Sequence, residues 1–140
     1  MKRKVLLDTG PLVALLDRRD HFHRWARTHF ADIDPPLLTC EAVLAEACHL
    51  LRHLNGGATA VLDLLGRGAV KVAFSLEEEA SPVRELLTRY ANVPIALADA
   101  CLVRMAELHA GSPVFTVDSD FSIDRIHGRR VVPMIRPAVR

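Results

Sequence analysis

The strongest constraint in this sequence is a short apolar run near its start that stops at a carboxylate. Residues 5–7 (VLL) are followed by Asp8, and Gly10 and Pro11 come directly after Thr9. An apolar run without alternation is typical of a strand covered on both faces, and Pro11 suits the first position of a following helix. Open α/β sheets bind ligands at the carboxyl ends of their strands. Asp8 is therefore predicted either to face a ligand site or to cap the helix.

The rest of the chain alternates between apolar runs and amphipathic stretches. Its 140 residues are expected to form a single domain, 1–140, with a sizeable core. Helices are predicted at about 11–16, 21–31, 39–54, 58–66, 76–90 and 96–109, and further strands at 37–39, 70–74, 114–117 and 130–133. The resulting order, β-α-α-β-α-α-β-α-α-β-β, predicts an α/β fold with a parallel sheet covered on both faces.

A second carboxylate falls on the apolar face of the helix predicted at 39–54. That face is expected to consist of Val43, Ala47, Leu50, Leu51 and Leu54. Glu46 lies within roughly 60° of Val43 and Leu50 at 3.6 residues per turn. An ionised carboxylate in such a setting costs several kcal/mol unless a cation, a metal or hydrogen bonds meet it. A buried arginine, such as Arg52 or Arg104, is the alternative partner to a metal.

Two later segments repeat this pattern. Asp99 is the only charged residue between positions 93 and 103, and its neighbours on the same helix face are apolar. The apolar run 114–117 ends on Asp118 and Asp120, as the opening run ends on Asp8. Plain packing would not choose an acid at any of these positions.

These acids form one candidate constellation, consisting of Asp8, Glu46, Asp99, Asp118 and Asp120. Gathered in one cleft, they would repel each other and in part protonate unless a divalent cation neutralised them. Hard oxygen ligands select Mg²⁺ or Mn²⁺, and such ions can activate water to attack a phosphodiester. His49 and His53 have i, i+4 spacing but lack the glutamate of a zinc-protease helix, so they are expected to be packing or surface residues.

Charge and cysteine content add limits. Eighteen basic and 17 acidic residues nearly cancel, but arginines gather in 18–27 and 121–140, where they could attract phosphate. The odd number of cysteines, Cys40, Cys48 and Cys101, predicts reduced, packed thiols and a cytoplasmic protein. No apolar run approaches the roughly 18 residues of a membrane span.

Taken in order, these motifs resemble the PIN-domain ribonucleases, and most of all the VapC toxins of toxin–antitoxin pairs. The resemblance covers LLDTGPLVALLD at 6–17, Glu46 after Leu-Leu-Thr, LADA at 97–100 and FTVDSDF at 115–121. It implies an α/β/α sandwich around a mainly parallel sheet, and Mg²⁺- or Mn²⁺-dependent cleavage of single-stranded RNA. It also implies a homodimer and a VapB-like antitoxin as partner.

The resemblance also assigns roles by position. Asp8, Asp99 and Asp118 would hold the ion, and Asp120 would serve a second ion or lie further out. Glu46 would position or deprotonate the attacking water, and the Thr116 hydroxyl would orient the cluster, while Thr9 matches a small residue beside the first acid. The expected RNA-backbone contacts are Arg18, Arg19, His21, Arg24, Arg125 and Arg129.

Other functions remain open on sequence grounds. The chain could be a PIN-type RNA-processing nuclease that is not a toxin. It could be a phosphatase or phosphotransfer enzyme in which Asp118 or Asp120 attacks phosphorus directly. It could also bind RNA or protein through its basic segments without cutting.

Overall fold

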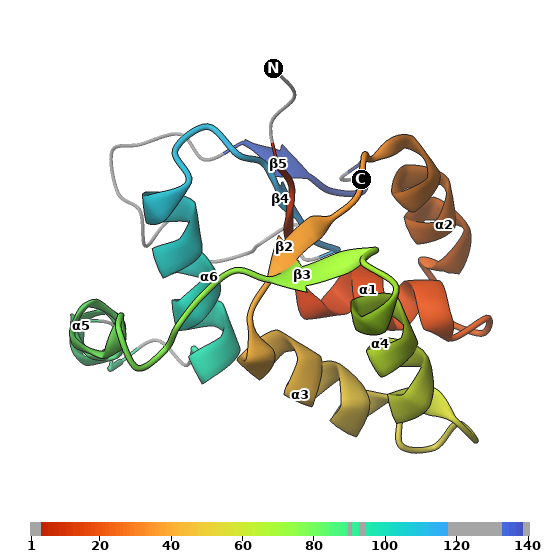
Figure 1. Ribbon diagram of the computed structural model, residues 1–140, viewed down its shortest axis with the longest axis horizontal. Helices are drawn as coiled ribbons and strands as arrows, with labels where there is room; N and C mark the ends of the chain where they lie inside the picture. The colour runs from red at the N-terminus through yellow and green to blue at the C-terminus, as the bar shows by residue number, and fades with distance from the viewer. Residues whose placement is uncertain (1–3, 90, 93–94, 118–132, 139–140) are drawn as a thin grey trace.

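The computed structural model describes residues 4–89, 91–92, 95–117 and 133–138. Its elements follow the predicted order, with five strands and six helices in this part of the chain (Figure 1). The strands are β1 (Leu6–Leu7), β2 (Leu37–Thr39), β3 (Val70–Val72), β4 (Val114–Phe115) and β5 (Met134–Ile135). The helices are α1 (Thr9–Leu16), α2 (His23–Asp32), α3 (Glu41–Leu50), α4 (Gly57–Gly66), α5 (Ala80–Arg89) and α6 (Leu97–Leu108).

All five strands form one parallel sheet in the order β3-β2-β1-β4-β5. The chain moves outward from β1 through β2 to β3, and then returns to place β4 on the other side of β1. The order therefore reverses between β1 and β4, and such a point leaves a crevice at the carboxyl ends of the two strands. Asp8 and Thr116 are the first residues after these two strands.

The sheet separates two apolar cores, because successive residues of a strand point to opposite faces. Leu6 and Val114 pack with α5 and α6, whereas Leu7 and Phe115 pack with the face covered by α1, α2 and α4 (Figure 1). Phe115 is fully buried, and the rings of Trp25 and Phe30 from α2 lie against it with centroids 5.2 and 5.1 Å away. This is the α/β/α sandwich predicted from the sequence.

Three helix boundaries differ from the sequence prediction. Helix α1 begins at Thr9 rather than at Pro11, which occupies the third position, where a helix still needs no backbone N–H. Helix α3 ends at Leu50, and Leu50 is exposed rather than part of the buried face, whereas Leu51 is fully buried after the helix has ended. The acidic residues 77–79 form a turn before α5 instead of its first turn.

Strand boundaries differ as well. Strands β3 and β4 are shorter than predicted, at three and two residues. The last strand, expected at 130–133, lies at Met134–Ile135, and residues 130–132 are outside the described part.

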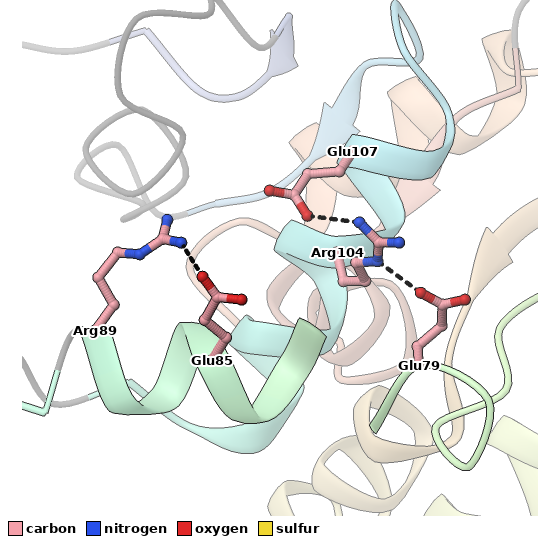
Figure 2. A network of polar contacts seen from close by, with 5 residues as sticks. All are labelled: Glu79, Glu85, Arg89, Arg104 and Glu107. Atoms are coloured by element: carbon pink, nitrogen blue, oxygen red, sulfur yellow. Dashed lines mark hydrogen bonds and ion pairs between the residues drawn. The ribbon is translucent and has the colours of Figure 1, made fainter. Parts of the chain in front are cut away.

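Two groups of ion pairs differ in burial: one links α6 to the turn before α5, and the other lies along α5 (Figure 2). Arg104 of α6 donates to Glu79 at 2.6 Å and to Glu107 at 3.1 Å, and all three side chains are only 21–29% exposed. Arg89 and Glu85 form a second pair along α5, on a far more exposed surface. Arg104 is thus engaged by Glu79 and Glu107, and is not the partner of Glu46.

The three cysteines are free, as predicted, and Cys40 and Cys101 are buried. Among the described helices, none combines the length and apolar character needed to cross a membrane.

Candidate active site

Asp8 lies at the point where the strand order reverses and is bound from two sides. It is the N-cap of α1, and its Oδ1 accepts a hydrogen bond from the Thr9 backbone N–H at 2.8 Å. Its Oδ2 accepts the Thr116 hydroxyl at 2.8 Å, across the gap between β1 and β4. The helix-capping reading of Asp8 is therefore confirmed, and its other oxygen joins the ends of the two strands, while the ligand-site reading stays a prediction.

Glu46 reaches the same site from the middle of α3. The Thr9 hydroxyl donates to Glu46 Oε1 at 2.6 Å, a hydrogen bond that links residues 37 positions apart. Arg52, the other arginine considered as a partner for Glu46, donates to the backbone oxygen of His49 instead. Glu46 is partly buried, as its place on the apolar face predicted. Its carboxylate is met by the Thr9 hydroxyl rather than by Arg52 or Arg104.

Asp99 is in the first turn of α6. Its Oδ2 accepts the backbone N–H of Ala96 at 3.1 Å, which helps to begin the helix. Leu102, Val103 and Ala106 on the same helix are buried, as predicted. Asp99 and Glu46 both lie near enough to Asp8 for their negative charges to act on it.

These surroundings change the acidity of Asp8. The pKa of Asp8 is raised from 3.8 to about 6. Burial is the largest cause, the hydrogen bonds from Thr116 and Thr9 partly oppose it, and the charges of Asp99 and Glu46 add to the rise. Desolvation and like charges both disfavour the ionised form. A cation bound beside Asp8 would favour the ionised form.

The donor chemistry of this site fits a hard divalent cation. Every candidate ligand is a carboxylate oxygen, and each oxygen of Asp8 accepts one hydrogen bond and so keeps a second lone pair. Within the described residues, however, no three His, Cys, Asp or Glu side chains are close enough together to hold a metal ion. Asp118 and Asp120, the other predicted ligands, lie outside the described part of the chain.

The predicted RNA contacts fall at the other end of α1. Arg18 and Arg19 come just after Asp17, the C-cap of α1, which puts them roughly 12 Å or more from Asp8 for an eight-residue helix, and Arg24 is on α2. His21 is exposed beside them. Arg125 and Arg129 lie outside the described part.

A surface hollow of about 690 Å³ in this region contains cationic groups that the sequence prediction did not select. It is lined by Leu15, Leu16, Arg18, His23, Arg27, Leu64 and Arg67. A neighbouring hollow of about 480 Å³ on α2 includes Arg24. Arg27 belonged to a visible basic cluster, but Arg67 is distant in sequence and gave no signal.

Comparisons with known proteins identify the family and the fold. A family model for the PIN domain matches residues 5–125. A solved structure of the toxin VapC20 from Mycobacterium tuberculosis, described as cleaving the sarcin–ricin loop, matches with a TM-score of 0.74 and 24% identity. The match covers 85% of this chain and 93% of that one. A search of curated proteins finds no significant match. The predicted resemblance is confirmed at the level of family and fold, and the chain belongs to the PIN-domain family.

Proposed function

We propose that this protein is a metal-dependent endoribonuclease that cleaves RNA phosphodiester bonds with an activated water, and that it is the toxin of a VapBC-type pair. The observation that carries the proposal is the position of Asp8. It is a buried acid at the switch point of a PIN fold, fixed by Thr9 and Thr116, with two further acids acting on it.

The chemistry follows from what each side chain can do. Asp8 and Asp99, with Asp118, would hold Mg²⁺ or Mn²⁺, and Asp120 would lie beside them. Such an ion supplies positive charge against the phosphate and a bound water of lowered pKa. Glu46 accepts the Thr9 hydroxyl through Oε1, so its Oε2 is the oxygen available to take a proton from water. The Thr116 hydroxyl keeps Asp8 Oδ2 turned toward the strand ends.

The phosphate groups of the RNA would be bound by basic side chains outside the acidic site. Arg18 and Arg24 line the two hollows, and within the described residues no carboxylate pairs with either of them. Arg19 and His21, which lie between them in the sequence, are proposed as further contacts. Unpaired arginines in a hollow suit phosphate groups, whatever the base sequence. Arg125 and Arg129 are proposed as further contacts.

The toxin assignment rests on the family and on the fold shared with VapC20. It includes a VapB-like antitoxin as partner, a homodimer, and action in the cytoplasm. The three free cysteines suit a reducing compartment.

The test is cleavage of labelled RNA by the purified protein with Mg²⁺, with Mn²⁺ and with EDTA. We expect cleavage with either metal, products carrying a 5′-phosphate, and no cleavage in EDTA. Asp99→Asn should lower the rate at least about 100-fold. Asp63→Asn, a neutralised exposed acid on α4, is the matched control and should cleave like the wild type. Cleavage that persists in EDTA, RNA binding without scission, or an active Asp99→Asn protein would overturn the proposal.

A further inference from the structure

We infer that Thr9 is a positioning residue for the proposed nuclease reaction, and that it fixes the carboxylate of Glu46 relative to Asp8. The inference rests on the function proposed above. Thr9 is buried and contacts both acids at once. Its backbone N–H donates to Asp8 Oδ1 at 2.8 Å, and its hydroxyl donates to Glu46 Oε1 at 2.6 Å.

The hydroxyl of Thr9 is not needed to begin α1. The N-cap of this helix is Asp8, whose side chain already accepts the first backbone N–H. Thr9 is the first residue within the helix, where a hydroxyl has no capping task. Its hydroxyl instead points from α1 toward α3, where it donates to Glu46, and this hydrogen bond accounts for its orientation.

The length of this hydrogen bond indicates a directed interaction. An oxygen–oxygen distance of 2.6 Å is typical of a hydroxyl that donates to an ionised carboxylate. Threonine is β-branched and adopts few side-chain rotamers in a helix, whereas glutamate has three rotatable bonds. The stiff side chain therefore sets the orientation of the mobile one.

The hydrogen bonds of Thr9 hold together two acids of like charge. Asp8 and Glu46 repel each other, as the effect of Glu46 on Asp8 shows. Because Thr9 donates a hydrogen bond to each of them, this one residue sets the distance between the two carboxylates. When Oε1 of Glu46 is held by Thr9, the orientation of Oε2 is fixed as well. The water that Glu46 positions would then occupy a single site.

The test compares steady-state cleavage by Thr9→Val, Thr9→Ser and a matched control. Valine keeps the shape of the side chain and removes the hydroxyl, whereas serine restores the hydroxyl. Thr39→Val removes another buried hydroxyl, which donates to the Leu7 carbonyl at 2.9 Å and, among the described residues, makes no hydrogen bond to an acid. We expect Thr9→Val to lower kcat by about 10- to 100-fold with KM for RNA and Mn²⁺ affinity unchanged. Thr9→Ser should recover most of kcat, and Thr39→Val should keep it.

A double-mutant cycle with Glu46→Gln separates positioning from a general structural role. If Thr9 acts through Glu46, Thr9→Val lowers kcat in the wild type and has no further effect on Glu46→Gln. The same fold-loss in both backgrounds, or a Thr9→Val protein as active as the wild type, would overturn the inference.

Two controls complete the design. Thermal unfolding checks each variant, and Thr9→Ala replaces Thr9→Val if the valine variant does not fold. A wild-type protein without metal-dependent cleavage would overturn the proposed function itself, and this inference with it.

Discussion

Replacing Asp8 by asparagine should stabilise the metal-free protein at neutral and alkaline pH, although the same change should abolish cleavage. The pKa of Asp8 is raised from 3.8 to about 6, chiefly by burial. A pKa raised that far corresponds to about 3 kcal/mol of preference for the neutral form in the folded state. Asparagine is always neutral, but it cannot accept hydrogen bonds at both of its terminal atoms, which offsets about 1 kcal/mol. The expected net gain is about 2 kcal/mol.

The sign of the pH dependence follows from the raised pKa. Below pH 3.8 Asp8 is protonated in both the folded and the unfolded chain, so burial of its charge costs nothing. Between pH 3.8 and about 6 the folded state binds the proton more tightly, so the contribution of Asp8 to stability falls as pH rises. Above about pH 6 the whole cost is present.

The measurement is urea unfolding of wild type and Asp8→Asn in EDTA at pH 8 and at pH 4. The advantage of the variant should be present at pH 8 and absent at pH 4. Asp63→Asn should stay within about 0.5 kcal/mol of the wild type at both. Excess Mg²⁺ should stabilise the wild type and not Asp8→Asn, because binding to the folded state alone adds stability. An Asp8→Asn protein that is less stable than the wild type at pH 8 in EDTA would refute the reasoning.

Two further predictions concern stability. Arg104→Met should lower the free energy of unfolding, measured in urea, by about 1 kcal/mol, because it removes two partly buried ion pairs. Arg89→Met should lower it by about 0.5 kcal/mol or less, because its pair is exposed. Equal losses would contradict the role given to burial. Phe115→Ala should cost about 3–5 kcal/mol. It should also change the emission of Trp25, the only tryptophan, whose ring lies 5.2 Å from Phe115; unchanged fluorescence would contradict that packing.

The sequence predicted the element order, the place of Asp8 at a strand end and the inward position of Glu46, because all three depend on local patterns. Apolar runs ending on acids mark strand ends, and a lone acid on an apolar helix face marks an inward position. Helix ends were predicted less well, because they depend on tertiary contacts. Leu50 continues the apolar periodicity of α3, but the chain turns at Leu51, which takes the buried place instead.

The parts that depend on distant residues were not visible in the sequence. No periodicity places Arg67 and Arg18 at the same hollow, because they follow the ends of two different helices, α4 and α1, which pack together only in the folded chain. The link from Thr9 to Glu46 also required the structure. A threonine after an acid reads as an ordinary helix start, and the direction of its hydroxyl depends on where α3 lies.

The carboxyl ends of the parallel strands and their amino ends should differ in how well they tolerate insertions. Asp8, Thr9, Glu46 and Thr116 all belong to segments that leave the carboxyl ends of strands, whereas the turn at 66–69 enters β3 from the opposite edge. Gly66 and Gly68 have open space around them. Fluorescent tags, affinity peptides or whole domains inserted at that turn should leave the acids undisturbed, and the same insertion after β1 or β4 would separate them. The fold thus offers an engineer one edge for attachments and reserves the other for chemistry.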